Sequence, residues 1–132
     1  MISLNFISPD ELKARIHDRD LYLWGASIVG FGICRALERN HITPAGFIDS
    51  SARMRGSVAL GYRVNMPADI LGKPAQRAKV PFIVITSGHY EHEIIAQCEQ
   101  NGLIKDRDFI SARIILYCFF PLPLYFQVLA SI

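Results

Sequence analysis

Two short segments, each combining an apolar run with glycine, constrain the fold of this chain more than any other feature. The first, Leu21-Tyr-Leu-Trp-Gly-Ala-Ser-Ile-Val-Gly30, has the pattern of a buried strand that ends in a glycine turn and continues into a helix. The second, Gly46-Phe-Ile-Asp49, has the pattern of another strand that ends in an acidic residue. A strand, a tight turn and a helix form the unit that presents backbone N–H groups to a phosphate, so the two segments predict an α/β fold with a nucleotide-type site.

The residues of this unit have distinct expected roles. Gly25 permits the tight turn after the first strand, and Gly30 lets the helix approach the sheet closely. Ser27 stands where dinucleotide-binding turns have their middle glycine, and its hydroxyl is suited to a phosphate oxygen. Asp49 is placed to accept hydrogen bonds from ribose hydroxyls. The residues expected to bind a cofactor are Gly25, Ala26, Ser27, Ile28, Gly30, Asp49, Ser50, Arg53, Ser87 and Gly88. The alternative is a scaffold turn that binds no ligand.

The rest of the chain alternates strand and helix patterns. A Ser8-Pro9-Asp10-Glu11 capping box predicts a helix through about Arg19. Five strands are expected, at residues 21–24, 45–48, 62–64, 82–86 and 108–110. Helices are expected at residues 28–40, 67–71 and 90–101, with loops at 50–61 and 73–81. Numbered in chain order, the strands predict a three-layer, mainly parallel, Rossmann-like sheet of order 3-2-1-4-5. Its crevice lies where the first and fourth strands diverge.

Composition narrows the possible partners. The net charge is only +2 and no long run of Lys or Arg occurs, which argues against nucleic-acid binding. The three cysteines, Cys34, Cys98 and Cys118, form no Cys-x-x-Cys pair, and no signal peptide is evident, so a cytoplasmic protein with buried thiols is expected.

The C-terminal segment has an unusual composition. No charged residue occurs from Ile114 to Ile132, although Pro121 and Pro123 argue against a membrane-spanning helix. We therefore divide the chain into a domain at residues 1–112 and an apolar segment at 113–132. This segment is expected to cover the domain's own sheet, to pack against a second copy in a homodimer, or to join a missing downstream domain.

One cluster of reactive residue types follows the fourth predicted strand. It is His89-Tyr-Glu-His-Glu93, at the start of a helix beside the expected crevice. His89 and Tyr90 are the candidate catalytic residues, because an imidazole near neutral pH suits acid–base work. His89 and His92 share a helix face with Glu93 nearby, but no further ligand with a recognisable spacing follows, so no metal site is expected.

Together with Gly46-Phe-Ile-Asp49, the segments Gly61-Tyr-Arg-Val64 and Asp106-Arg-Asp-Phe-Ile110 resemble the small Rossmann-like domains of bacterial surface-sugar metabolism. These are the NAD(P)-binding domains of capsule nucleotide-sugar dehydratases and epimerases, and the N-terminal nucleotide-sugar-binding domains of sialic-acid and bacillosamine acyltransferases. The resemblance covers roughly residues 21–110. It implies NAD, NADP or a nucleotide sugar as ligand, with the turn at residues 25–30 on the phosphate and Asp49 on the ribose. Ile28 stands where the acyltransferase domains often have histidine, and the chain has no Tyr-x-x-x-Lys pair of the short-chain reductase type.

Three classes of function remain open at this point. The first is a nucleotide-binding domain within or beside an enzyme of sugar-nucleotide metabolism. The second is a complete small enzyme that modifies a nucleotide sugar and uses His89. The third is an accessory or N-terminal module, either of a larger methyltransferase or radical enzyme or of a non-catalytic assembly.

Overall fold

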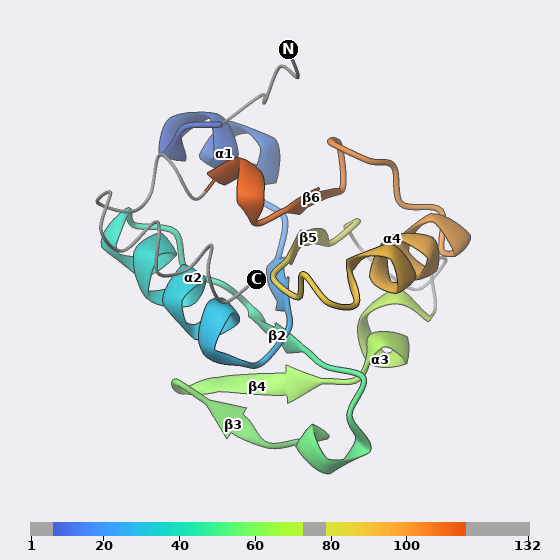
Figure 1. The fold of residues 1–132 in the computed structure, drawn as a ribbon. Coiled ribbons are helices and arrows are strands. Elements are labelled where there is room, and N and C mark those ends of the chain that lie inside the picture. The colour runs from blue at the N-terminus through green and yellow to red at the C-terminus, as the bar shows by residue number, and fades with distance from the viewer. Residues whose placement is uncertain (1–6, 73–78, 116–132) are drawn as a thin grey trace.

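The computed structural model describes residues 7–72 and 79–115 (Figure 1). Cys118, residues 73–78 of the predicted surface connection and most of the apolar C-terminal segment lie outside these ranges. In chain order, the elements are α1 (Pro9–Ile16), β1 (Leu21–Trp24), α2 (Ile28–Arg39), β2 (Gly46–Ile48), the 3-10 helix η1 (Ala52–Met54), β3 (Val58–Ala59), β4 (Tyr62–Asn65), α3 (Pro67–Leu71), β5 (Phe82–Ile85), α4 (Glu91–Gln100) and β6 (Phe109–Ser111).

The strands form one six-stranded sheet of order β3-β4-β2-β1-β5-β6. All neighbouring strands are parallel except β3 and β4, which are antiparallel, so the sheet is mixed. This order differs from the predicted five-strand order because β3 forms within the region predicted as a loop. The five parallel strands have the predicted relative positions. The β3–β4 hairpin turns at Leu60 and Gly61, whose φ angles of 53° and 87° suit a two-residue hairpin turn.

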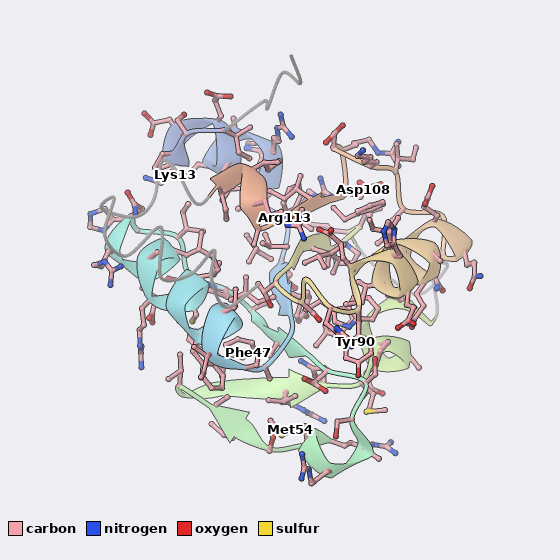
Figure 2. The ribbon with its side chains drawn as sticks, viewed as in Figure 1. Lys13, Phe47, Met54, Tyr90, Asp108 and Arg113 are labelled. Carbon is pink, nitrogen blue, oxygen red and sulfur yellow. The ribbon has the colours of Figure 1, made fainter. Side chains whose placement is uncertain are left out.

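Helices cover both faces of the sheet, which makes three layers (Figure 1). Side chains alternate along a strand, so Leu21 and Leu23 of β1 pack on the face covered by α1 and α2, whereas Trp24 joins the cluster under α3 and α4. Phe47 of β2 lies between α2 and β4 (Figure 2) and makes edge-to-face ring contacts with Phe31 and Tyr62. The α/β class predicted from the sequence is therefore present, with a sheet buried on both faces.

The ends of α1 follow from local chemistry. At its start, the Ser8 Oγ accepts a hydrogen bond from the Glu11 N–H at 3.2 Å, and the Glu11 carboxylate accepts one from the Ser8 N–H at 3.5 Å. The predicted capping box is thus confirmed. The helix ends at Ile16, before the predicted end, because His17 and Asp18 have φ angles of 23° and 67°, outside the helical region.

The chain continues into the core at the predicted boundary after Ala112. The Ile7 N–H donates to the Ile114 carbonyl at 3.0 Å, and Ile115 is fully buried in the cluster under α1 and α2. The first residues of the apolar C-terminal segment therefore belong to the packed domain.

One arginine, Arg19, connects several chain segments by hydrogen bonds near the N-terminal ends of β1 and β5. Arg19 Nη2 donates to the buried carboxylate of Asp108 at 2.8 Å, and its other donors bond to the carbonyls of Val80, Pro81, Arg15 and Arg107. Burial alone would raise the pKa of Asp108. Hydrogen bonds from Arg107 and from the Ile104 N–H, with the charges of Arg107 and Arg19, outweigh burial and lower that pKa. Figure 2 shows Asp108 at the top of the view, beside β6.

Candidate functional site

A cleft of about 560 Å³ opens where β1, β2 and β5 end. The direction of the chain across the sheet reverses at β1. The strands that follow β1 in sequence, β2 to β4, lie on one side of it, and β5 and β6 lie on the other. Ligands of open α/β sheets bind at such a point, beyond the carboxyl ends of the strands. Residues of the turns after the three strands that line the cleft are Gly25, Ser27, Asp49, Ser50, Ser51 and Ser87. The other lining residues are Trp24, the α4 N-cap Tyr90, and the α4 residues Glu93, Ile94 and Gln97.

The glycine turn after β1 is held by Thr86, a residue that the sequence pattern does not mark as part of a site. Gly25 has a φ of 133°, a conformation that disfavours any side chain, and a Cβ there would collide with the Thr86 Oγ1. The buried Thr86 hydroxyl hydrogen-bonds to the carbonyls of Trp24 at 3.0 Å and Gly25 at 3.1 Å. The only sequence signal for this role is a threonine that ends an apolar strand directly before Ser87 and Gly88.

The predicted close approach of α2 to this turn is present at Gly30. A Cβ on Gly30 would overlap the carbonyl oxygen of Gly25 and lie 3.1 Å from the Thr86 Oγ1. No larger residue fits without moving the turn or the helix. A Cβ on Gly32, two residues further along the same helix, would meet no neighbouring element within 4 Å, so the constraint is local to Gly30.

The N-terminus of α2 lies beside the cleft, since its N-cap residue lines it. Ser27 is the N-cap, but its side chain makes no capping hydrogen bond, although it lines the cleft. The first helical hydrogen bond runs from the Phe31 N–H to the Ser27 carbonyl at 2.8 Å. The amides at positions 28–30 therefore precede the helical ladder and have no carbonyl one turn back within the helix. With the positive end of the helix dipole, they form a suitable environment for an anion.

Asp49 bridges the turns after β1 and β2. Its Oδ2 accepts a hydrogen bond from the Ala26 N–H at 3.2 Å, and its Oδ1 accepts one from the Ser51 N–H at 2.8 Å. The sequence pattern predicts that this carboxylate faces a ribose. It lines the cleft as expected, but it also fixes the two turns that frame it. A carboxylate has about four lone-pair positions, so two backbone bonds leave capacity for ligand hydroxyls.

One face of α4, with its N-cap, contributes a polar stripe to the opposite wall of the cleft. Tyr90, Glu93 and Gln97 follow one another at helical spacing on the lining face. The Ser87 Oγ accepts a hydrogen bond from the Tyr90 N–H at 3.3 Å, which fixes the entry to the helix. Figure 2 shows Tyr90 on the side of the sheet covered by α3 and α4. Glu93 and Gln97 were not among the predicted ligand-binding residues, because the face that a helix turns toward a cleft depends on tertiary packing.

Several predicted site residues lie elsewhere. His89 is exposed, stacks its ring edge-to-face on Tyr90 at 4.7 Å between centroids, and does not line the cleft. Ile28 is 79% exposed, and its side chain is outside the lining, as are Gly88 and Arg53. Arg53 lies on η1 with an exposed side chain. Of the two catalytic candidates, only Tyr90 borders the cleft, and no imidazole of the described residues lines it.

The charge of the cleft is negative. Asp49 and Glu93 line it, and its lining among the described residues includes no Lys or Arg. Among the described residues, the lining groups suited to an anion are therefore backbone amides and hydroxyls.

The buried cysteines lie apart from this chemistry. Burial raises the pKa of the Cys34 thiol to about 11 and that of Cys98 to about 12, so both are protonated thiols near neutral pH. Each packs in one of the two hydrophobic clusters, as expected for structural thiols.

Comparisons with known proteins do not assign a family. No protein-family model matches this sequence, and no curated protein matches it. Within residues 7–72 and 79–115, no helix has the length and apolar character needed to cross a membrane. Across the same residues, no group of three His, Cys, Asp or Glu side chains is arranged to hold a metal ion. The function is therefore inferred from the cleft itself.

Proposed function

We propose that this chain is a nucleotide-binding domain whose ligand, NAD(P) or a nucleotide sugar, occupies the cleft at the ends of β1, β2 and β5. One observation carries the proposal. Ser27, the N-cap from which the open amides of α2 follow, and the carboxylate of Asp49 line the same cleft at the point where strand order reverses. Backbone N–H donors beside a carboxylate acceptor match the phosphate and the ribose hydroxyls of a nucleotide.

The contacts available define how the ligand would be oriented. The phosphate lies over the amides of residues 28–30 with the Ser27 hydroxyl, and the ribose hydroxyls donate to Asp49 and reach Ser50. Tyr90, which is 55% exposed, offers an aromatic face on the opposite wall. This role is binding and orientation, and a place beside or within an enzyme of bacterial sugar-nucleotide metabolism follows from the resemblance noted above.

The test is a thermal-shift and calorimetry panel that uses NAD, NADP, UDP-glucose, GDP-mannose, coenzyme A and S-adenosylmethionine at millimolar concentration. We expect at least one nucleotide to raise the melting temperature of the wild type. Absence of any shift across the panel would overturn the proposal.

The decisive variant is Ser27→Asp. An aspartate at this N-cap supplies the missing cap and stabilises the unliganded protein by about 0.5–1 kcal/mol, while its charge occupies the phosphate position. We expect a higher melting temperature without ligand and loss of the ligand-induced shift. Ser8→Asp, at the N-cap of α1 and away from the cleft, is the matched control and should keep the shift. Retention of the shift in Ser27→Asp would mean that the ligand does not use the α2 N-terminus.

A further inference from the structure

The cleft described above does not end at Gln97. A second cavity of about 450 Å³ shares Ser50 and Gln97 with it and extends between α3 and α4. Beyond these shared residues it is lined by Met66, Pro67, Ala68, Leu71, Gly72 and Asn101. The two cavities are thus compartments of one groove that runs from the glycine turn after β1 to the face of α3.

The two compartments differ in chemistry. The first carries the carboxylates of Asp49 and Glu93 and lies next to the open amides of α2. The described lining of the second compartment contains no ionisable side chain. It consists of hydroxyl and amide groups on Ser50, Gln97 and Asn101 and of apolar groups on α3 and the residue before it. Such a mixture suits an uncharged group that has both hydroxyls and apolar C–H faces.

The amide of Asn101 is held in place. Its Nδ2 donates to the Gln97 carbonyl at 2.8 Å within the last turn of α4. One N–H and the carbonyl oxygen of this amide remain for other partners. A side chain already fixed by one hydrogen bond loses little conformational entropy on binding, which favours recognition of a ligand hydroxyl.

We infer that the second compartment binds the sugar of a nucleotide sugar, with the nucleotide in the first compartment. This inference rests on the proposed nucleotide-binding function and selects among its ligands. The described lining of the second compartment includes no charged side chain, and its amides beside Pro67 and Met66 match the hydroxyl edge and C–H face of a pyranose. The shared residues Ser50 and Gln97 lie at the junction between nucleotide and sugar.

The experiment compares matched ligand pairs by calorimetry: UDP with UDP-glucose, GDP with GDP-mannose, and AMP with NAD. For the base that the protein prefers, we expect the nucleotide sugar to bind about tenfold more tightly than the bare nucleotide, which corresponds to one or two net hydrogen bonds. Equal affinity of the two, or NAD as the tightest ligand of the set, would overturn the sugar assignment while leaving nucleotide binding intact. Absence of binding by every nucleotide would overturn both proposals.

A blocking variant locates the sugar. Ala68 is exposed on α3 and lines only the second compartment, so Ala68→Trp fills that space with little effect on the core. We expect the variant to bind the nucleotide sugar no better than the bare nucleotide and to keep wild-type affinity for the latter, which also verifies its fold. Ala96→Trp, at an exposed position of α4 outside both linings, is the control and should preserve the advantage of the nucleotide sugar. Retention of that advantage in Ala68→Trp would place the sugar elsewhere.

Discussion

Replacement of Arg19 by methionine should destabilise the fold strongly, although Arg19 belongs to no strand and lies at the opposite edge of the sheet from the cleft. A guanidinium has five N–H donors, and Arg19 makes five hydrogen bonds, to four carbonyls and to Asp108. Its side chain is only 18% exposed, and its guanidinium lies 5.3 Å from the centroid of the Phe82 ring. Methionine retains the apolar stem but none of these donors.

The expected cost follows from these contacts. The bonds to the Val80 and Arg107 carbonyls are exposed, so water can replace them, whereas the part-buried bonds to Arg15 and Pro81 contribute about 1 kcal/mol each. Asp108 keeps its bonds to Arg107 and the Ile104 N–H, so loss of its ion pair with Arg19 adds only about 1 kcal/mol, and we expect a total of about 3 kcal/mol. With an unfolding entropy of about 2.1 cal/mol/K per residue, this lowers the melting temperature by about 11 °C.

Thermal unfolding followed by circular dichroism tests this expectation. Arg107→Met is the matched control, because Arg107 also pairs with Asp108 but has a side chain 60% exposed, and exposed ion pairs contribute little. We expect it to lower the melting temperature by a small fraction of the Arg19→Met effect. A fall of under about 3 °C for Arg19→Met, or equal effects of the two variants, would refute the argument that Arg19 is the main tie of this edge.

The remaining predictions concern the helix beside the turn, the ligand, pH and association. Gly30→Ala should lower the free energy of unfolding, measured by urea denaturation, by about 1–3 kcal/mol, because the new Cβ overlaps the Gly25 carbonyl. Gly32→Ala should raise it by up to about 1 kcal/mol, and the reverse order would refute the close approach of α2 to the turn. If NAD binds, the carboxylate of Asp49 should repel a 2′-phosphate, so titration should give weaker binding for NADP, and equal or tighter NADP binding would contradict this. Because folding lowers the pKa of Asp108, its carboxylate stabilises the fold fully at pH values above the unfolded carboxyl pKa of about 3.9. This stabilisation is lost as the pH falls through the lower pKa of the folded state. Below pH 4, the urea midpoint of Asp108→Asn should therefore depend less on pH than that of the wild type. Finally, the part of the apolar segment that follows the packed Ile115 should form a homodimer interface, and sedimentation of the intact chain as a stable monomer would exclude it.

The sequence was sufficient to predict the parallel sheet and the position of its crevice. The strands at 21–24 and 82–85 are short, apolar and bounded by turn residues. A strand that is covered by helices on both faces needs apolar residues at every position, so this pattern can be read from the sequence. Gly25 was identifiable for a similar reason, since an abrupt turn after a buried strand requires backbone freedom. The strand β3 was missed because two residues with an exposed Val58 give no periodic signal.

The composition of the cleft was only partly predictable. Sequence places Asp49 at the end of β2, but its two backbone hydrogen bonds depend on how β1 and β2 pair. Likewise, the rotation of α4 about its axis decides that Glu93 and Gln97 line the cleft, and this rotation is set by burial of Ile94 and Cys98. His89 precedes the helix and lies outside the lining. The support of the turn by Thr86 requires contact between segments about sixty residues apart, which no local pattern encodes.

The walls of the cleft come from segments around residues 24–27, 49–51 and 87–97, so the cleft exists only when β1, β2 and β5 are assembled side by side. A ligand that binds in the cleft does not bind the unfolded chain, so it stabilises the state in which the whole sheet is formed. By mass action, a ligand at one hundred times its dissociation constant would raise the free energy of unfolding by about 2.7 kcal/mol. Amide hydrogen exchange in all three strands should then slow by a common factor, although only their ends touch the ligand. Shared protection of this kind would allow an unknown ligand to be recognised without any assay of a reaction.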